Sequence, residues 1–520
     1  MSAPLRSSPS VLFLLFLVAA FSTSIVLAQN TESSWARDGW TYQRDEQAGI
    51  QVQTKELAIH PRAEATPALK HRFLPDAFEA APGNAAVFYL KALGFLEQDH
   101  ARERIAQFRK DALAHAKEEG KPFDQAPPYV WMNTAPDKLP IEEVKEYLRL
   151  SSFQSFFLRE AALRNRFDMD RKFRELDDPI AYLLPEIQNM RELARTQSMR
   201  CRLAIAEDRI ADAVEIIGQQ FALARHLGQD DFLVSNLVGI AIASIAWNDS
   251  LYLVQHPQTP NLYWATATMP TPLVDMRRAM AIERQFLYQQ IKVLREVDET
   301  PRPAGYWRDF IDRLMPQLGL LASELELPSV SQDPDAARAA VVGFIAAAYP
   351  GAKRYLIDDQ GMDREQVEAY PTAQVVFLAM VRYHNHWRDE VFKWTHLPFW
   401  QARTKATSSA VQQALSKDAE RLGWSALPTQ ALLPAVLAAR TAEARCDQII
   451  ALLQTVEAIR MYAAENDGKL PPTLSALPVP APIEPFTGKP IEYELIGERG
   501  VLNGHALPGL RYRLIVRIAD

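Results

Sequence analysis

The sequence has few cysteines. Among 520 residues there are two, Cys201 and Cys446, and neither has a second cysteine or a histidine at metal-ligand spacing. Both lie on predicted helices far apart in the chain, so two alternatives stay open. They pair as a disulfide, as two thiols can in an oxidising compartment, or they are buried free thiols that behave as small hydrophobic side chains.

Motifs that commit a chain to one reaction are also missing. There is no Gly-x-Ser-x-Gly elbow, P-loop or Rossmann glycine pattern. The net charge of −7 is small for this length, and no basic run suggests a face for nucleic acid. The sequence therefore predicts no cofactor, no metal and no nucleic-acid partner.

The first thirty residues form a secretory signal pattern. Arg6 precedes an uninterrupted apolar run at 11–21, a polar Ser-Thr-Ser break follows, and Ala28 ends a site suited to signal peptidase. We expect a signal peptide at 1–28, cleaved between Ala28 and Gln29, and a mature chain that is periplasmic or extracellular. No cysteine precedes Gln29, which argues against a lipoprotein. The alternative is an inner-membrane signal anchor, because 11–28 approaches the lower limit of about 17–25 residues for a spanning helix.

The rest of the chain has an ordinary soluble composition, 48% hydrophobic and 23% charged. Prolines gather in connectors, and the periodicity between them is helical. We expect helices at 84–98, 102–119, 141–167, 187–206, 210–227, 232–255, 272–297, 307–325, 335–348, 364–395 and 409–422. The apolar run at 237–247 has polar residues at both ends, so it predicts a buried core helix and no further membrane span.

The clearest unit is the pair of helices at 187–206 and 210–227, joined by Glu207-Asp208-Arg209. Small residues Ala204 and Ala213 would allow the two helices to pack closely, as in a tetratricopeptide hairpin. No second copy follows at a 34-residue period, so the sequence does not predict a repeat array.

The C-terminal region has a different pattern. A long helix is expected at 435–466, and Gly468 and Pro471 end it. Alternating apolar residues at 491–495 and 512–518 predict strands. The predicted fold is therefore mainly α: a signal peptide at 1–28, an extended segment at 29–64, a multi-helical body at 65–430, and a long helix with a small antiparallel sheet at 431–520.

Several segments resemble a group of uncharacterised exported helical proteins common in planctomycete bacteria. They are ALKHRFLP at 68–75, PGNAA at 82–86, the hairpin segment at 192–215, PNLYWA at 260–265, VEAYP at 367–371 and FKW at 392–394. The resemblance implies export and a helical fold, and it implies no activity.

The C-terminal segment resembles the globular part of type II secretion pseudopilins. The matching parts are IRMYAAENDGKLPPTLSAL at 459–477 and EPFTGKP at 484–490. Glu484 stands where that pattern has Asp, and charged residues such as Arg440 and Asp447 replace the pseudopilin's N-terminal hydrophobic helix. The resemblance therefore implies the small α+β shape and not filament assembly.

Four residues are weak candidates for chemistry. His384 and His386 are two positions apart, so on a helix their side chains point about 200° apart and cannot face one ion. His386 and Glu390 are spaced i, i+4, but two ligands do not make a zinc site. Glu283 is either a buried carboxylate with a shifted pKa or an anchor of helix packing. The acidic stretch at Asp168 is expected to be a solvated loop.

Two functions fit these observations. The first is a non-enzymatic exported scaffold that binds a protein or another envelope component, and it predicts a broad groove lined by aromatic and apolar residues. The second is an exported hydrolase of unfamiliar type. It predicts a pocket where His384, His386, Glu390, Asp168 and Glu283 converge.

Overall fold

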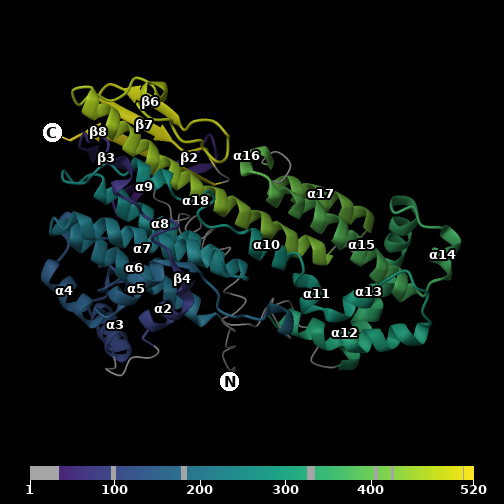
Figure 1. Cartoon of the computed structure of the whole chain (residues 1–520). Helices are drawn as coiled ribbons and strands as arrows, with labels where there is room; N and C mark the ends of the chain where they lie inside the picture. The colour runs from purple at the N-terminus through teal and green to yellow at the C-terminus, as the bar shows by residue number, and fades with distance from the viewer. Residues whose placement is uncertain are drawn as a thin grey trace.

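The computed structural model describes residues 34–94, 101–176, 184–324, 334–402, 408–422, 427–506 and 509–519, so the predicted signal peptide and its cleavage site lie outside the described residues. The described chain is mainly helical, which confirms the predicted fold class. Two groups of helices lie side by side, and the long helix α18 (Leu427–Glu465) runs along both of them (Figure 1).

The first group of helices contains the predicted hairpin. Helices α6 (Pro185–Ala206) and α7 (Ile210–Leu227) pack together, and Ala204 and Ala213 are fully buried. Helix α8 (Leu233–Leu253) packs on both of them and on α18. The other helices of this part of the chain are α2 (Ala85–Ala92), α3 (Ala101–Glu118), α4 (Ile141–Leu150) and α5 (Gln154–Ala162).

The second group of helices follows α9 in the chain, and short helices lead from α9 into it. Its helices pack mainly around α13 and α15. After α9 (Tyr263–Ala267), the elements of this half are α10 (Arg277–Glu283), α11 (Phe286–Gln290), α12 (Ala304–Glu324), α13 (Pro334–Arg354), α14 (Arg364–Ala369), α15 (Thr372–Phe392), α16 (Phe399–Ala402) and α17 (Ser408–Leu422).

Three predicted helices are each divided. The segment 141–167 forms α4 and α5, followed by a short strand at Arg164–Arg166, and the helix is interrupted near Ser151, whose carbonyl accepts a hydrogen bond from Arg200 of α6. The segment 364–395 is divided at Tyr370, which is extended, as residues before proline tend to be. The segment 272–297 contains α10, α11 and a 3₁₀ turn in place of one helix.

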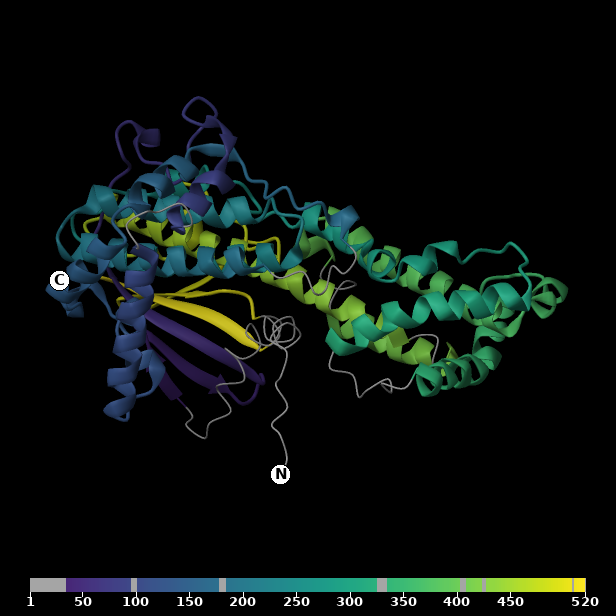
Figure 2. The ribbon, with the colours of Figure 1, turned by 90° about the horizontal axis from the view of Figure 1, so that it is seen from below.

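The sheet differs from the prediction. Strands β6 (Glu492–Ile496), β7 (Arg499–Asn503) and β8 (Leu510–Ile518) are antiparallel as expected. However, β8 also pairs in parallel with β3, from Gln51 opposite Leu510 to Ile59 opposite Ile518. The sheet is therefore six-stranded and mixed, in the order β1-β2-β3-β8-β7-β6, and the purple and yellow strands lie side by side in Figure 2.

The expected extended segment at 29–64 thus supplies three strands. They are β1 (Ser34–Arg37), β2 (Trp40–Asp45) and β3 (Ile50–Ile59). Between β1 and β2, Asp38 and Gly39 have φ values of 52° and 73°, which a two-residue type I′ hairpin turn requires. Two further short strands, β4 (Ala81–Asn84) and β5 (Arg164–Arg166), pair with each other elsewhere.

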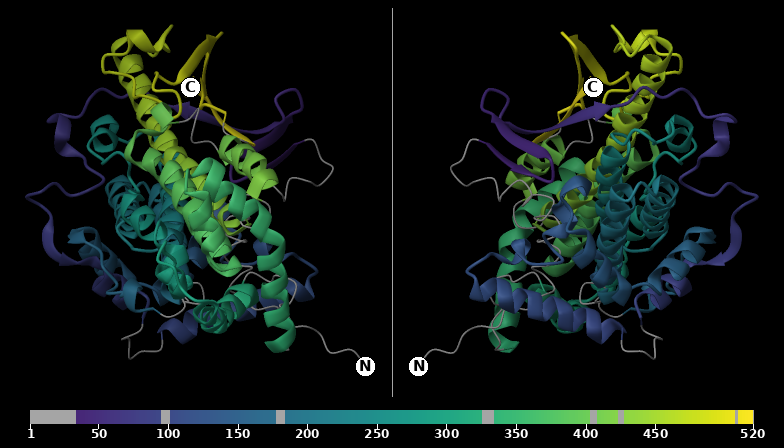
Figure 3. Two further views of the ribbon diagram at one scale, coloured as in Figure 1. Left: turned by 90° about the vertical axis from the view of Figure 1, so that its right-hand side faces the viewer. Right: turned by 90° about the vertical axis from the view of Figure 1, so that its left-hand side faces the viewer.

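The hydrophobic core has two main parts. The larger joins both groups of helices, and the other lies between the sheet and helices α8 and α18, with Leu57, Trp247 and Leu452 among its buried side chains. Figure 3 shows the sheet on one side of the molecule with α18 beside it. The apolar run at 237–247 forms the middle of α8, which confirms the predicted core helix. Among the described helices, none is long and apolar enough to cross a membrane.

Candidate functional site

The predicted histidine candidates point to different surroundings. His384 of α15 is buried, its Nδ1 lies 3.4 Å from the Thr429 hydroxyl, and burial lowers its pKa to about 4. His386 is exposed. Glu390 forms an ion pair with Lys393 at 2.5 Å. Within the described ranges, no three His, Cys, Asp or Glu side chains are grouped to hold a metal ion.

The other two candidates, Glu283 and Asp168, form no hydrogen bond or ion pair with these residues. Burial raises the pKa of the Glu283 carboxyl to about 7, and no described side chain forms a hydrogen bond or ion pair with it. Asp168 lies in a loop, where its backbone N–H donates to the Asn84 side chain at 3.0 Å. The convergence that the hydrolase hypothesis predicted is therefore not found among the described residues.

The two cysteines are both buried and free. Cys201 lies on α6 and Cys446 on α18, in the larger hydrophobic core. The disulfide alternative is therefore not formed, and the thiols pack as small apolar groups.

A buried polar network joins the β1–β2 turn to the helices. Arg202 of α6 donates to both carboxylate oxygens of Asp38, at 2.8 and 2.9 Å, and to Asp249 of α8 at 3.1 Å. The Lys55 ammonium donates to the Asn248 side chain at 2.8 Å, and burial lowers its pKa to about 7. We interpret this network as structural, because its charged groups are largely buried and are paired with one another.

The best candidate site is a groove of about 680 Å³ beside α18. We call it the α18 groove. Its walls come from four segments far apart in the chain: the loop after α9, the stretch leading into α16, one face of α18, and the loop before β6. Most of its lining is apolar, aromatic or proline: Ala267, Met269, Pro270, Pro272, Leu397, Pro398, Phe399, Trp400, Ala444, Ile450, Ala451, Pro482, Ile483 and Pro485.

The rim of the α18 groove exposes large hydrophobic side chains. Ile483 is 62% exposed, Trp400 42% and Leu397 40%. The indole of Trp400 lies on Gly488, where an added Cβ would come within 2.7 Å of Cδ2 of the ring. Phe399 packs edge-on against Phe486, with ring centroids 4.9 Å apart. The rim is therefore both rigidly supported and open to solvent.

The floor of the groove holds two carboxyl groups one turn apart on α18. The Asp447 carboxyl accepts the Leu273 N–H at 3.1 Å, and Glu443 accepts the Met276 N–H at 3.0 Å and pairs with Arg440. Burial, with a contribution from Glu443, raises the pKa of Asp447 to about 7. Burial also raises the pKa of Glu443. Both groups hold the start of α10 against α18.

Sequence reasoning identified part of this site. It predicted a groove lined by aromatic and apolar residues without locating it, and it treated Asp447 only as a departure from the pseudopilin pattern. The usable signal was the i, i+4 spacing of Glu443 and Asp447 on the long predicted helix. The β1–β2 turn was also missed, although Asp-Gly between alternating residues is a strong hairpin signal.

Comparisons of the chain with protein-family models, with curated proteins and with solved structures find no match.

Proposed function

We propose that the protein is an exported, non-enzymatic binding protein, and that its α18 groove takes an extended segment of a partner protein in the cell envelope. The observation that carries the proposal is the exposed hydrophobic rim formed by Leu397, Trp400 and Ile483. Exposed apolar patches of this kind are typical of interaction sites.

The lining favours a polypeptide over a glycan. Met269, Ile450 and Ile483 are aliphatic and match apolar side chains. Sugars need many polar side chains instead. Aromatic-lined grooves are one of the recurring ways in which proteins bind extended peptides. At the floor, the Asp447 carboxyl accepts one backbone N–H, that of Leu273, so it can accept a further donor from the bound segment.

The proposal can be tested with short random peptides displayed on phage and selected on the immobilised mature chain. We expect enriched peptides rich in apolar residues. Their affinity, measured by fluorescence anisotropy, should fall about tenfold or more in Ile483→Asp, because losing an apolar anchor of a binding surface costs about 2 kcal/mol. Ile483 is largely exposed, so the variant should fold.

The matched control is Phe78→Ala, which removes a side chain that is 97% exposed and does not line the groove. Its peptide affinity should equal that of the wild type. Peptides that bind Ile483→Asp and the wild type equally would remove the groove as the binding site. Binding of oligosaccharides in place of peptides would also overturn the proposal.

A second candidate function, an exported hydrolase, is favoured by one observation. The carboxyls of Glu443 and Asp447 lie on one face of α18, where Cβ atoms at i, i+4 are about 5–6 Å apart. A carboxyl with a pKa of about 7 can exchange a proton at neutral pH. A hydrolase of this type would release nitrophenol from chromogenic esters or glycosides, and Asp447→Asn would slow it by about a hundredfold or more. Equal turnover by Asp447→Asn, or none by the wild type, would remove this candidate.

A further inference from the structure

The α18 groove contains one carboxyl group, that of Asp447, that forms no ion pair with any of the described residues. Asp447 lies in the middle of the face of α18 that lines the groove. The other lining residues of this face recur at helical spacing and are Arg440, Glu443, Ala444, Ile450, Ala451 and Gln454. The Asp447 carboxyl therefore lies among the apolar side chains that a bound segment would contact.

Other buried carboxyls of this protein are satisfied more fully. Glu457, also on α18, pairs with Arg460 at 2.9 Å. Glu484 accepts one side-chain amide and two backbone N–H groups, at 2.8, 3.0 and 2.8 Å. A carboxylate has about four acceptor sites, and Asp447 uses one of them, for a backbone N–H at 3.1 Å. It therefore keeps acceptor capacity that these two groups have used.

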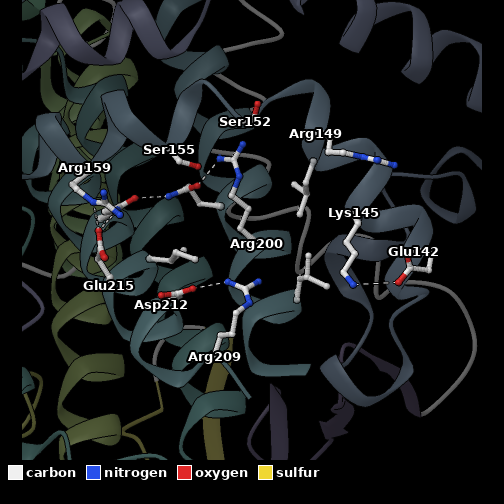
Figure 4. A pocket seen from close by; sticks show the side chains of 15 residues that line it. Glu142, Lys145, Arg149, Ser152, Ser155, Arg159, Arg200, Arg209, Asp212 and Glu215 are labelled. Atoms are coloured by element: carbon white, nitrogen blue, oxygen red, sulfur yellow. Dashed lines mark hydrogen bonds and ion pairs between the residues drawn. The ribbon is translucent and has the colours of Figure 1, made fainter. Parts of the chain in front are cut away.

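A second cavity shows the same contrast. It has a volume of about 540 Å³ and lies between α4, α5, α6 and α7 (Figure 4). Each carboxylate that lines it pairs with a lining cation: Glu142 with Lys145 at 3.2 Å, Asp212 with Arg209 at 2.6 Å, and Glu215 with Arg159 at 2.5 Å. The carboxylates of that cavity need no cation from a ligand, whereas Asp447 has none of its own.

The basic residues that line the α18 groove do not supply this cation. Arg440 pairs with Glu443, and Arg277 pairs with Asp275 at 2.5 Å. His396 lies on the exposed rim. Burial raises the pKa of the Asp447 carboxyl to about 7, and a cation placed beside it would favour its ionised form. A ligand that brings its own cation would therefore complete the floor of the groove.

We propose that the partner segment in the α18 groove carries a lysine between apolar residues, and that its ammonium group pairs with Asp447. This inference rests on the proposed function. The aliphatic stem of lysine packs on apolar walls while its head reaches a charge, and Ile450 and Ala451 supply such a wall. One oxygen of Asp447 already accepts the Leu273 N–H. A point charge such as an ammonium can use the other oxygen, whereas the fork of an arginine matches two.

The test compares two versions of a peptide selected on the chain that begins at Gln29. One keeps the selected lysine, and the other has norleucine, which retains the stem and removes the charge. Binding is measured by calorimetry at low ionic strength and pH 8, above the pKa of Asp447. We expect norleucine to weaken binding to the wild type about tenfold or more, and to weaken binding to Asp447→Asn less than about twofold.

Asp447→Asn keeps a side-chain oxygen for the Leu273 N–H, so it should fold. The control is Asp312→Asn, which removes an exposed carboxylate outside the groove. It should distinguish the two peptides as the wild type does. Because the norleucine exchange changes only the peptide, the comparison on the wild type does not depend on how any variant folds.

Equal binding of both peptides to the wild type would overturn the lysine contact, and so would the same discrimination by Asp447→Asn. If Ile483→Asp still weakened those peptides, the groove would remain a peptide site and only this inference would fail. Selection of peptides without a shared lysine would have the same meaning. Absence of any peptide binding would remove the proposed function and this inference together.

Discussion

Individual residues of this protein are governed by burial more than by their sequence neighbours. His384 and His386 are two positions apart, yet one is buried with a lowered pKa and the other is exposed. Asp447 lies on the same long helix as the buried Cys446, but it faces the α18 groove and receives a backbone N–H. A titratable residue's role in this fold therefore depends on what packs against it.

Asp447 leads to a prediction about pH. Its pKa is 3.8 in the unfolded chain and about 7 in the folded protein, so the folded state binds more protons between these values. The contribution of the Asp447 carboxyl to the free energy of unfolding is therefore fully present below about pH 4, and it is lost as the pH rises to about 7. We expect the free energy of unfolding of Asp447→Asn to rise relative to that of the wild type by about 4 kcal/mol between pH 4 and pH 8.

The measurement is urea unfolding of both proteins across that range. Asp312→Asn, which removes an exposed carboxylate paired with Arg338, is the charge-matched control. Parallel stability curves for the wild type and Asp447→Asn would mean that the carboxyl is ionised in the folded protein at neutral pH. That result would contradict the raised pKa of Asp447 and its proposed role in proton exchange.

At the scale of elements, buried ion pairs hold the β1–β2 turn against the helices. Arg202 lies between Asp38 of the turn and Asp249 of α8, and all three side chains are largely or fully buried. The Lys55 ammonium lies 3.9 Å from the centroid of the Tyr252 ring in the same network. This network connects the N-terminal strands to the hairpin that the sequence predicted, so the two elements are expected to be stable together.

The corresponding prediction concerns Arg202→Met. The variant leaves the buried carboxylates of Asp38 and Asp249 without their ion-pair partner, and breaking a buried pair in this way costs about 3–5 kcal/mol. The matched control is Arg209→Met in the α6–α7 turn, whose exposed ion pairs should contribute less than about 1 kcal/mol. Chemical unfolding measures both. Similar losses in the two variants would mean that the buried network does not hold the fold together.

At the scale of the whole molecule, the two ends of the described chain form one sheet. The parallel pairing of β3 with β8 covers the second hydrophobic core, together with α8 and α18. Leu57 and Ile59 of β3 are fully buried in it. The C-terminal module is therefore completed by residues of the N-terminal segment.

Truncation tests this dependence. A chain beginning at residue 61 lacks β1, β2 and β3, so it exposes apolar side chains of β8 and α18. We expect it to bind a hydrophobic dye and to be cut by protease within 491–519, whereas a chain beginning at Gln29 should resist. Mass spectrometry of the fragments identifies the cuts. Equal resistance of the two chains would mean that β6, β7 and β8 fold without the N-terminal strands.

The helices were largely predictable from sequence, because a helix bonds within itself and its apolar period is local. The hairpin at α6 and α7 was predicted to within a few residues. The predicted helix 141–167 was wrong as one unit: it is interrupted near Ser151, whose carbonyl accepts a hydrogen bond from Arg200 of α6, and residues 164–166 form a strand that pairs with β4. Both partners lie outside residues 141–167.

The sequence by itself determined the mainly helical class, the long C-terminal helix and the antiparallel strands that follow it. Only the tertiary structure decided that the N-terminal segment pairs with β8, because strands form their hydrogen bonds with partners that can lie anywhere in the chain. The same holds for the α18 groove, which brings Trp400, Asp447 and Ile483 together through packing that no local pattern encodes.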